Sequence, residues 1–380
     1  MFKFFPYVLK NLWRQRTRTL LTVSGSAVAL FLFSVVGAVQ EGLDRLTRDR
    51  QNERTLIVFQ ANRFCPFTSR LPQDYERAIA KQAGVADVVP VQLFMNNCRA
   101  SLDLVVFYGV PPAKLRTCRN LRVVAGDWSD FEKRHDGALV GQALARRRGL
   151  APGQKFSVGE VTVTVAGVFT SADPAEENYL YCNLDFLQRT RSLNAVGLVT
   201  QFEVLLNDGA NADTVCRGID EQCRGGPVQT DTRTRGVFQA NAVGDLVELI
   251  GFANYLGYAC VGLVLALVGT TTVMAVQDRT REHAVLQTLG FSEGRIFGLV
   301  VSESVLVSLA GGVLGVALAQ AGLALGGLAV GTEGVTIAFT PSWRLGLTGL
   351  AVSLAVGVLA GLVPAWQAAR AEIVASLRYV

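Results

Sequence analysis

Four long runs almost free of charged residues constrain this chain more than any other feature of its sequence. Crossing about 30 Å of hydrocarbon takes about 20 mostly apolar residues in a helix, and each run is long enough. Only the third contains a charge, Glu303. The runs are Thr19–Val39, Leu249–Val276, Ile296–Val330 and Leu345–Ala369. We therefore predict an α-helical membrane protein with four transmembrane helices.

Composition supports a membrane protein with one soluble part. Of the 380 residues, 50% are hydrophobic and 18% are charged, whereas a soluble domain carries about 25% charged residues. Intrinsic disorder is excluded, because a disordered chain combines low hydrophobicity with high charge. We expect no nucleic-acid partner, because the excess of positive charge does not lie on the soluble part.

The net charge of +5 indicates how the chain crosses the membrane. Acidic and basic residues balance from residue 41 onward, so the surplus comes from five N-terminal residues: Lys3, Lys10, Arg14, Arg16 and Arg18. Basic residues in short segments favour the cytoplasmic side. We predict a multi-pass protein of the cell (inner) membrane with cytoplasmic N- and C-termini, and a large extracytoplasmic segment between helices one and two.

Residues 1–18 also have the pattern of a helix at the membrane surface. Lys10, Arg14 and Arg18 recur every four residues on one face, and apolar residues including Trp13 line another. Such a helix places basic groups at lipid phosphates, so membrane lipids are expected partners. Two alternatives stay open: the basic residues only determine topology, or the helix contacts a cytoplasmic protein.

The extracytoplasmic segment, 41–236, is predicted to be a mixed α/β domain. Alternation of apolar and polar residues predicts a strand within 155–169 after a turn at Gly159, and Ala212–Cys223 is predicted to be a helix. Polar residues 228–236 indicate a linker, and 237–248 a helix that continues into span two. Further predicted strands are 55–59, 88–94, 102–110 and 201–206, with a helix at 72–83.

Six cysteines lie in this domain: Cys65, Cys98, Cys118, Cys182, Cys216 and Cys223. Outside the cytoplasm disulfides persist, so these residues can form disulfides whose pairing the sequence does not determine. A Cys216–Cys223 bond is disfavoured, because seven helical residues separate the two by about 10 Å. A metal site is the weaker alternative, because the domain has no Cys-x-x-Cys and only one histidine.

Motifs for nucleotide binding and hydrolysis are missing. The sequence has no GxxxxGK[ST] or HExxH, and only two histidines. We therefore expect a non-enzymatic chain that binds no cofactor itself.

The segment 277–295, between spans two and three, is charged and amphipathic. Arg281–Leu289 is predicted to be a short helix that ends at Gly290 in a left-handed turn, after which Ser292 caps the next helix. Such a helix at the mouth of the membrane can transmit force from a bound protein. The alternative is a solvated connecting loop.

Polar and small residues inside the spans indicate helix contacts. Glu303 lies about 10 Å into the third span, and a carboxylate at that depth faces protein or water, or reaches back to the interface. Gly311 with Gly315, and Gly357 with Gly361, allow close helix approach. A dimer contact at these glycines is one possibility.

Several segments resemble FtsX/MacB-like (type VII) ABC transporter permeases. The stretch DRTREHAVLQTLGFSEGRIFGLVVSESVLVSLAGGVLG is similar to their cytoplasmic signature, and GLVPAWQAARAEIVASLR to their C-terminal ending. FYGVPPAKL, VVAGDWSD, ALVGQALARRRGLAPGQKF and VTVTVAGVF resemble the MacB-type periplasmic core domain. His283 stands where the family usually has an aliphatic residue.

The resemblance implies that two permeases pair, as a homo- or heterodimer, and that a separate ABC ATPase subunit, which carries the ATP, binds below residues 279–290. Only 18 residues precede the first span, so we expect no ATPase domain on this chain. A periplasmic adaptor is a further possible partner. The ATPase-coupling residues would be Arg279, Arg281, Glu282, Leu286, Leu289 and Gly290.

The implied function is an ABC permease that couples ATP hydrolysis to movement of the extracytoplasmic domain, for export or extraction of a lipoprotein, lipid, peptide or drug. Two alternatives stay open: an FtsX-like regulator of an envelope enzyme, and a membrane-anchored domain without an ATPase. The predicted parts, beyond those already given, are spans at 19–40, 296–325 and 345–369, a stalk and span at 237–276, a short outer loop at 326–344, and a cytoplasmic tail at 370–380.

Overall fold

The computed structural model describes residue 14 and residues 16–48, 54–63, 68–95, 104–191, 195–326, 329–332 and 335–370. The chain forms two units. The first contains residues 1–40, 249–325 and 341–380, and the second contains residues 41–248 and 326–340. The second unit is called the α/β domain below.

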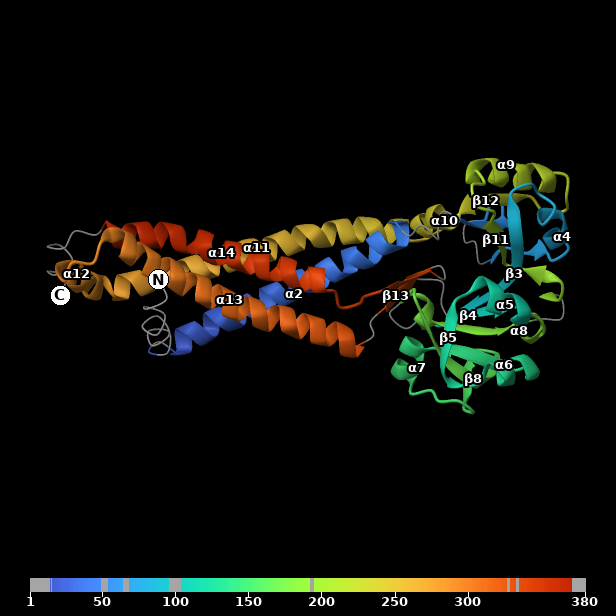
Figure 1. Cartoon of the computed structure of the whole chain (residues 1–380), viewed down its shortest axis with the longest axis horizontal. Helices are drawn as coiled ribbons and strands as arrows, with labels where there is room; N and C mark the ends of the chain where they lie inside the picture. The colour runs from blue at the N-terminus through green and yellow to red at the C-terminus, as the bar shows by residue number, and fades with distance from the viewer. Residues whose placement is uncertain are drawn as a thin grey trace. The chain divides into compact units, whose positions relative to one another are not determined.

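Within these described residues, four helices are long and apolar enough to cross a membrane, which agrees with the predicted number of spans. They are α2 (Arg16–Arg48), α11 (Gly244–Asp278), α13 (Glu293–Gly326) and α14 (Trp343–Ala369). A shorter helix, α12 (Thr280–Thr288), joins α11 to α13. Figure 1 shows the four long helices running alongside one another.

Small residues let these helices approach closely. A Cβ added at Gly311 would lie 2.5 Å from Ser26 Cβ in α2, and one added at Gly357 would lie 2.8 Å from Val305 Cα in α13. Gly315 likewise meets the Ala27 carbonyl, and Gly361 meets Ser304. All four glycines that the sequence singles out therefore pack against neighbouring helices of the same chain.

Two serines add a reciprocal link between α13 and α14. Ser308 Oγ donates to the Ser353 carbonyl and Ser353 Oγ donates to the Ser308 carbonyl, each at 2.7 Å. Both residues are fully buried. Hydrogen bonds of this kind fix the register of two spanning helices that have little polar surface elsewhere.

Aromatic and basic residues at both ends of α14 indicate where the membrane interfaces lie. Trp343 and Trp366 are exposed, and each lies beneath a guanidinium, that of Arg344 and of Arg370 respectively. The two tryptophans are about 35 Å apart along the helix axis. Tryptophan and arginine collect at membrane–water interfaces, and this spacing fits a membrane-spanning helix.

The α/β domain is built on one ten-stranded sheet with the order β12-β1-β11-β3-β4-β9-β6-β8-β5, with β7 pairing with β8. The pairs β4–β9 and β6–β8 are parallel and the other pairs are antiparallel. The strands are β1 (Thr55–Gln60), β3 (Val85–Met95), β4 (Val106–Val110), β5 (Leu121–Gly126), β6 (Gly137–Gly141), β7 (Lys155–Val158), β8 (Val161–Ser171), β9 (Tyr179–Asn183), β11 (Gln201–Leu206) and β12 (Thr230–Thr234). A small separate sheet pairs β2 (Leu71–Pro72) with β10 (Leu198–Val199).

Apolar side chains divide the domain into two lobes. The first lobe is formed by β1, β11 and β12 with α4 (Tyr75–Ile79) and α9 (Ala212–Cys223), around a core that includes Phe202 and Ile219. The second lobe is formed by the six strands from β4 to β9 in chain order, around cores that include Phe107 and Tyr181. Strand β3 contacts both lobes. The shorter helices of the domain are α5 (Pro112–Cys118), α6 (Trp128–Lys133), α7 (Gln142–Arg148), α8 (Leu184–Arg191), α10 (Arg235–Ala242) and the 3-10 turn η3 (Glu176–Asn178).

The structure confirms most of the predicted elements of the domain and corrects two. Residues 228–236 are not a linker: Thr230–Thr234 form β12, which pairs antiparallel with β1. The predicted helix at 72–83 is shorter, because Leu71–Pro72 form a strand and α4 ends at Ile79. Gly159 has a φ of +58° and forms the predicted turn, here between the paired strands β7 and β8.

The segment between α13 and α14 is structured and belongs to the α/β domain. It forms a hairpin of β13 (Ala329–Thr332) and β14 (Val335–Ala338). Val335 and Ile337 form a small core with Val243, which lies between α10 and α11. The sequence predicts only a short outer loop at 326–344 and places the end of the α/β domain at 236, so both boundaries differ from the structure.

Candidate functional site: the α12 end of the helices

Helix α12 lies at one end of the four spanning helices and has the local structure that its sequence predicts. It begins after Arg279, whose backbone leaves the helical region with φ −115° and ψ 17°. It ends at Thr288, and Gly290, two residues later, has a φ of +90°, a left-handed conformation that glycine adopts without strain. Phe291 N–H then donates to the Leu286 carbonyl at 3.1 Å, which closes the helix before α13 begins.

One side of α12 packs on the spanning helices and the other is open. Ala284 is buried and Leu286 is half-buried, whereas Val285 is 45% exposed and Leu289 is 72% exposed. Gln287 Nε2 donates to the Ala369 carbonyl at the end of α14 at 3.4 Å. The helix is thus attached to its neighbours and still presents apolar side chains outward.

A buried ion pair connects the start of α12 to the interior of α13. Arg279 Nη1 donates to both carboxylate oxygens of Glu303, at 3.2 and 3.1 Å. The side chains are only 9% and 19% exposed. A carboxylate inside a spanning helix is costly unless it is paired, and Arg279 provides the counter-charge.

Two further ion pairs lie at the same end of the helices. Arg18 in α2 pairs with Asp278 in α11 at 3.0 Å, and Arg14 pairs with Glu282 in α12 at 3.2 Å. These pairs are more exposed than Arg279–Glu303 and contribute less to stability. Together the three pairs join α12 and its start to α13 and to Arg14, which precedes α2, and join α2 to the end of α11.

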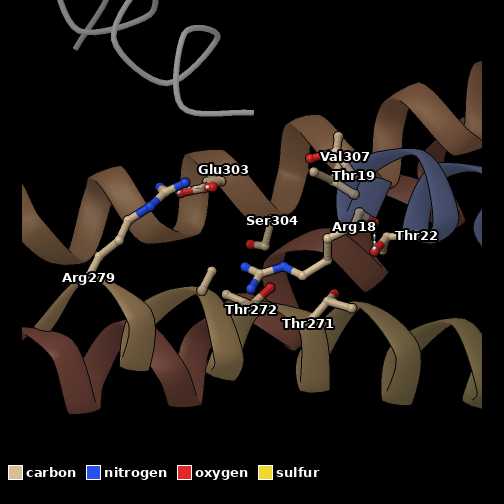
Figure 2. Close-up of a pocket in the computed structure, with 10 residues that line it drawn as sticks. Arg18, Thr19, Thr22, Thr271, Thr272, Arg279, Glu303, Ser304 and Val307 are labelled. Atoms are coloured by element: carbon tan, nitrogen blue, oxygen red, sulfur yellow. Dashed lines mark hydrogen bonds and ion pairs between the residues drawn. The ribbon is translucent and has the colours of Figure 1, made fainter. Parts of the chain in front are cut away.

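A small polar cavity of about 30 Å³ lies beside the Arg279–Glu303 pair. Figure 2 shows Arg18 extending toward Thr271 and Thr272, with Arg279 and Glu303 facing each other. The hydroxyls of Thr22, Thr271, Thr272 and Ser304 donate to backbone carbonyls. The cavity has room for one or two water molecules, so its polar groups can be hydrated within the helix bundle.

Two family models match this chain. The model of the MacB-like periplasmic core domain matches residues 19–222, which is more than half of the chain, and that of the FtsX-like permease C-terminal matches residues 255–373. The chain belongs to the FtsX/MacB-like family of ABC transporter permeases. It is a multi-pass membrane protein with an α/β domain inserted between the first and second spans.

Known relatives agree with this assignment. The permease is 31% identical over 123 residues to the uncharacterized ABC transporter permease YknZ of Bacillus subtilis, covering 32% of this chain and 30% of that one. It is 25% identical over 394 residues to the pyoverdine export ATP-binding/permease protein PvdT of Pseudomonas syringae, covering 96% of this chain and 58% of PvdT. The chain therefore spans about a third to three fifths of the length of these relatives.

Among solved structures, the periplasmic region of MacB from Actinobacillus actinomycetemcomitans is similar to 52% of this permease. The match covers 97% of that chain, at 12% sequence identity and a TM-score of 0.38.

The structure brings together some of the predicted site residues of this permease and separates others. Arg279, assigned to ATPase coupling by the resemblance, and Glu303, predicted to be an intramembrane carboxylate, are partners in one ion pair. Arg281 is exposed on α12, and Glu282 pairs with Arg14. Residues 1–13, which hold most of the predicted surface helix, and the tail at 371–380 lie outside the described residues.

His283, the family departure noted in the sequence, faces the interior side of α12. Its Nδ1 is buried and has no hydrogen-bond partner among the residues that the structure describes. Burial, together with the nearby Arg279 guanidinium, lowers the pKa of His283 below its usual value. The imidazole is therefore neutral at neutral pH.

The cysteines are free wherever the structure describes them: Cys118, Cys182, Cys216, Cys223 and Cys260. Cys216 and Cys223 share α9, as predicted. Cys65 and Cys98 lie outside the described residues, so the predicted disulfides find no pair among the four described cysteines of the α/β domain. Burial raises the pKa of Cys216 to about 11 and that of Cys118 to about 12, so both are protonated thiols.

Sequence reasoning missed a buried group of charges in the α/β domain. Arg119 pairs with Glu176 at 3.1 Å and with Glu203 at 2.5 Å, and Arg235 lies 4.0 Å from Glu176. We call these four residues the buried charge cluster. They come from four elements far apart in the sequence, so no local spacing indicates that they meet.

Proposed function

We propose that this permease couples a separate ABC ATPase subunit, bound at α12, to movement of the α/β domain on the other side of the membrane. The open face of α12 is the observation that carries the proposal. Val285 and Leu289 are exposed apolar residues on a short helix outside the spans. Apolar side chains of this kind, flanked by the charges of Arg281 and Glu282, suit a protein partner.

The ion pairs give the bound ATPase a way to act on the spans. Arg279 joins the start of α12 to Glu303, and Glu282 joins α12 to Arg14. A displacement of α12 would therefore pull on α13 and on the start of α2 rather than being absorbed by a loose loop. The polar cavity beside Glu303 would provide water to the charges while they move.

Two helices run without interruption from the first unit into the α/β domain, which supports the transmission of motion beyond the membrane. Helices α2 and α11 each contribute residues to both units. We expect ATP to be bound by the partner subunit and a second permease, identical or not, to complete the assembly; a periplasmic adaptor is a further expected partner.

For the substrate, we propose export or extraction of a lipoprotein, lipid, peptide or hydrophobic drug. The relative PvdT is named for export of pyoverdine, which supports outward transport as the general activity. The basic N-terminal residues favour a cytoplasmic N-terminus in the inner membrane, and with four spans the C-terminus is cytoplasmic too.

A single charge on the open face of α12 tests the ATPase interaction. Leu289→Asp should abolish co-purification of an ABC ATPase with the tagged permease, because a carboxylate would be desolvated in an apolar contact. Thr117→Asp, at an exposed position in the α/β domain, is the control and should retain the ATPase. Equal recovery of the ATPase with Leu289→Asp and the control would refute binding at this face.

The side of the membrane on which the α/β domain lies can be tested separately. A protease site inserted after Gly149, an exposed turn residue with a φ of +64°, should be cleaved from outside the inner membrane in spheroplasts. Protection in intact spheroplasts with cleavage only after lysis would show that the α/β domain faces the cytoplasm, and the proposed function would fail.

A further inference from the structure

The buried charge cluster lies where the two lobes of the α/β domain meet. Arg119 follows α5 in the second lobe, and its guanidinium reaches Glu203 in β11 of the first lobe and Glu176 at the start of η3. The four side chains of the cluster are at most 13% exposed. One arginine thus joins carboxylates from both lobes in an interior that excludes most water.

Two segments that lead to the spanning helices converge on the cluster. Arg235 is the first residue of α10, which precedes α11, and its guanidinium lies 4.0 Å from Glu176. The hairpin between α13 and α14 contributes Thr336. Its N–H donates to Tyr179 Oη, and its hydroxyl donates to the carbonyl of Ala175, next to Glu176, each at 3.4 Å.

The surroundings keep the cluster charged and tightly packed. Burial alone would lower the pKa of Arg119, but the nearby Glu203, Tyr181 and Glu176 outweigh it and raise the pKa. Tyr108 packs against Tyr181 with the two rings tilted by 55° and their centroids 5.6 Å apart. Tyr181 Oη is buried without a hydrogen-bond partner among the described residues, so a small shift in the cluster can give it one.

Stability alone is a poor explanation for such a cluster. Replacing a buried ionic group by apolar residues of similar volume is often neutral or stabilising, whereas removing one member leaves an uncompensated charge. A buried ionic group does, however, strongly favour the geometry in which its charges balance. Moving Arg235 away would leave Glu176 and Glu203 facing only Arg119.

We propose that Arg235 is a positioning residue through which α10 sets the arrangement of the two lobes. The inference rests on the proposed function, because it takes ATP-driven motion of the spans as the source of the displacement. Motion of α11 would shift α10 and Arg235, and Glu176 and Arg119 would then carry the change to β11 in the first lobe and to β9 in the second.

Hydrogen exchange of the complete assembly tests the proposal. The full-length permease in nanodiscs, with its co-purified ATPase, is compared with and without ATP and vanadate. In the wild type, nucleotide should change exchange in both lobes, in β11 and in β9. In Arg235→Met, nucleotide should still change exchange in α10, but the change in β9 and β11 should be lost.

Two variants separate this role from general destabilisation. Arg235→Lys keeps a positive charge and should restore part of the response. Arg233→Met is the matched control. Arg233 is a half-exposed arginine on the edge strand β12 that pairs with Asp231, and its variant should respond as the wild type does. If Arg235→Met does not fold, Arg235→Met/Glu176→Gln removes both charges and takes its place.

The outcomes distinguish the two proposals. A full nucleotide response of both lobes in folded Arg235→Met would overturn the role of Arg235 and leave the proposed function standing. A nucleotide response of the wild type that is confined to one lobe would also overturn the role of Arg235 and leave the proposed function standing. If nucleotide changes exchange nowhere in the wild-type α/β domain, the proposed function fails and the inference fails with it.

Discussion

Arg279 and Glu303 form a nearly buried ion pair between the start of α12 and the interior of a spanning helix, with one guanidinium nitrogen 3.1 and 3.2 Å from the two carboxylate oxygens. The pair joins α12, where we propose that the ATPase binds, to the interior of α13. Arg279 provides the counter-charge for the carboxylate of Glu303, and the ion pair attaches α12 to α13.

Arg279→Met should therefore destabilise the permease strongly. The variant leaves a buried carboxylate without its partner, which costs about 3–5 kcal/mol when a buried pair is broken. The double variant Arg279→Met/Glu303→Met removes both charges and should recover most of the loss. Thermal unfolding in detergent measures both effects.

The Arg18–Asp278 pair serves as the comparison. Its side chains are 26% and 57% exposed, so Arg18→Met should cost no more than about 1 kcal/mol. Equal losses of stability from Arg279→Met and Arg18→Met would show that the buried ion pair stabilises the permease no more than the exposed one.

Gly315→Ala should weaken the packing of α13 on α2. The added Cβ would meet the Ala27 carbonyl and approach the Phe31 nitrogen at 3.0 Å, and overpacking of this kind costs about 1–3 kcal/mol. Gly322→Ala in the same helix has open space around its Cβ and should change stability by less than about 0.5 kcal/mol. If both variants unfold at the same temperature, the contact of Gly315 with α2 is not a tight one.

The spans and several elements of the α/β domain could be predicted because their signals are local. The uncharged runs give four helices, and Ala212–Cys223 is α9 with the predicted bounds. Asn211 caps that helix by accepting from Thr214 N–H, a signal within four residues. Patterns of this kind do not depend on the rest of the fold.

Other features depend on partners distant in the sequence. The polar segment Thr230–Thr234 becomes a strand because β1 pairs with it, although its own composition resembles a linker. Glu303 could be recognised as an intramembrane carboxylate, but its partner Arg279 lies 24 residues away across a turn. Arg119 and Glu203 are 84 residues apart, and only the fold brings them together.

Cys182 should resist alkylation in the native permease. Its thiol is fully buried and donates weakly to the Tyr108 carbonyl, and burial raises its pKa well above the usual value. Because the thiolate is the reactive form, N-ethylmaleimide should modify the half-buried Cys216 before Cys182. Mass spectrometry of digested protein gives the order.

The same labelling tests the state of the cysteines. After denaturation without a reductant, Cys118, Cys182, Cys216 and Cys223 should all be modified, as free thiols are. A disulfide-linked peptide containing any two of them would contradict the structure.

His283 should make the permease less stable as the pH falls. Its pKa is lowered in the folded protein, by burial and by the Arg279 guanidinium, so the unfolded chain binds the proton more readily. Stability is therefore fully present above the unfolded pKa of about 6.5 and is lost as the pH falls through that value toward the lowered folded pKa. His283→Leu removes the imidazole and should reduce this loss in thermal unfolding measured from about pH 7.5 to pH 5. His135→Leu, at an exposed position in the α/β domain, is the control and should keep the wild-type pH dependence. A pH dependence that His283→Leu leaves unchanged would show that this imidazole is not a source of the acid sensitivity.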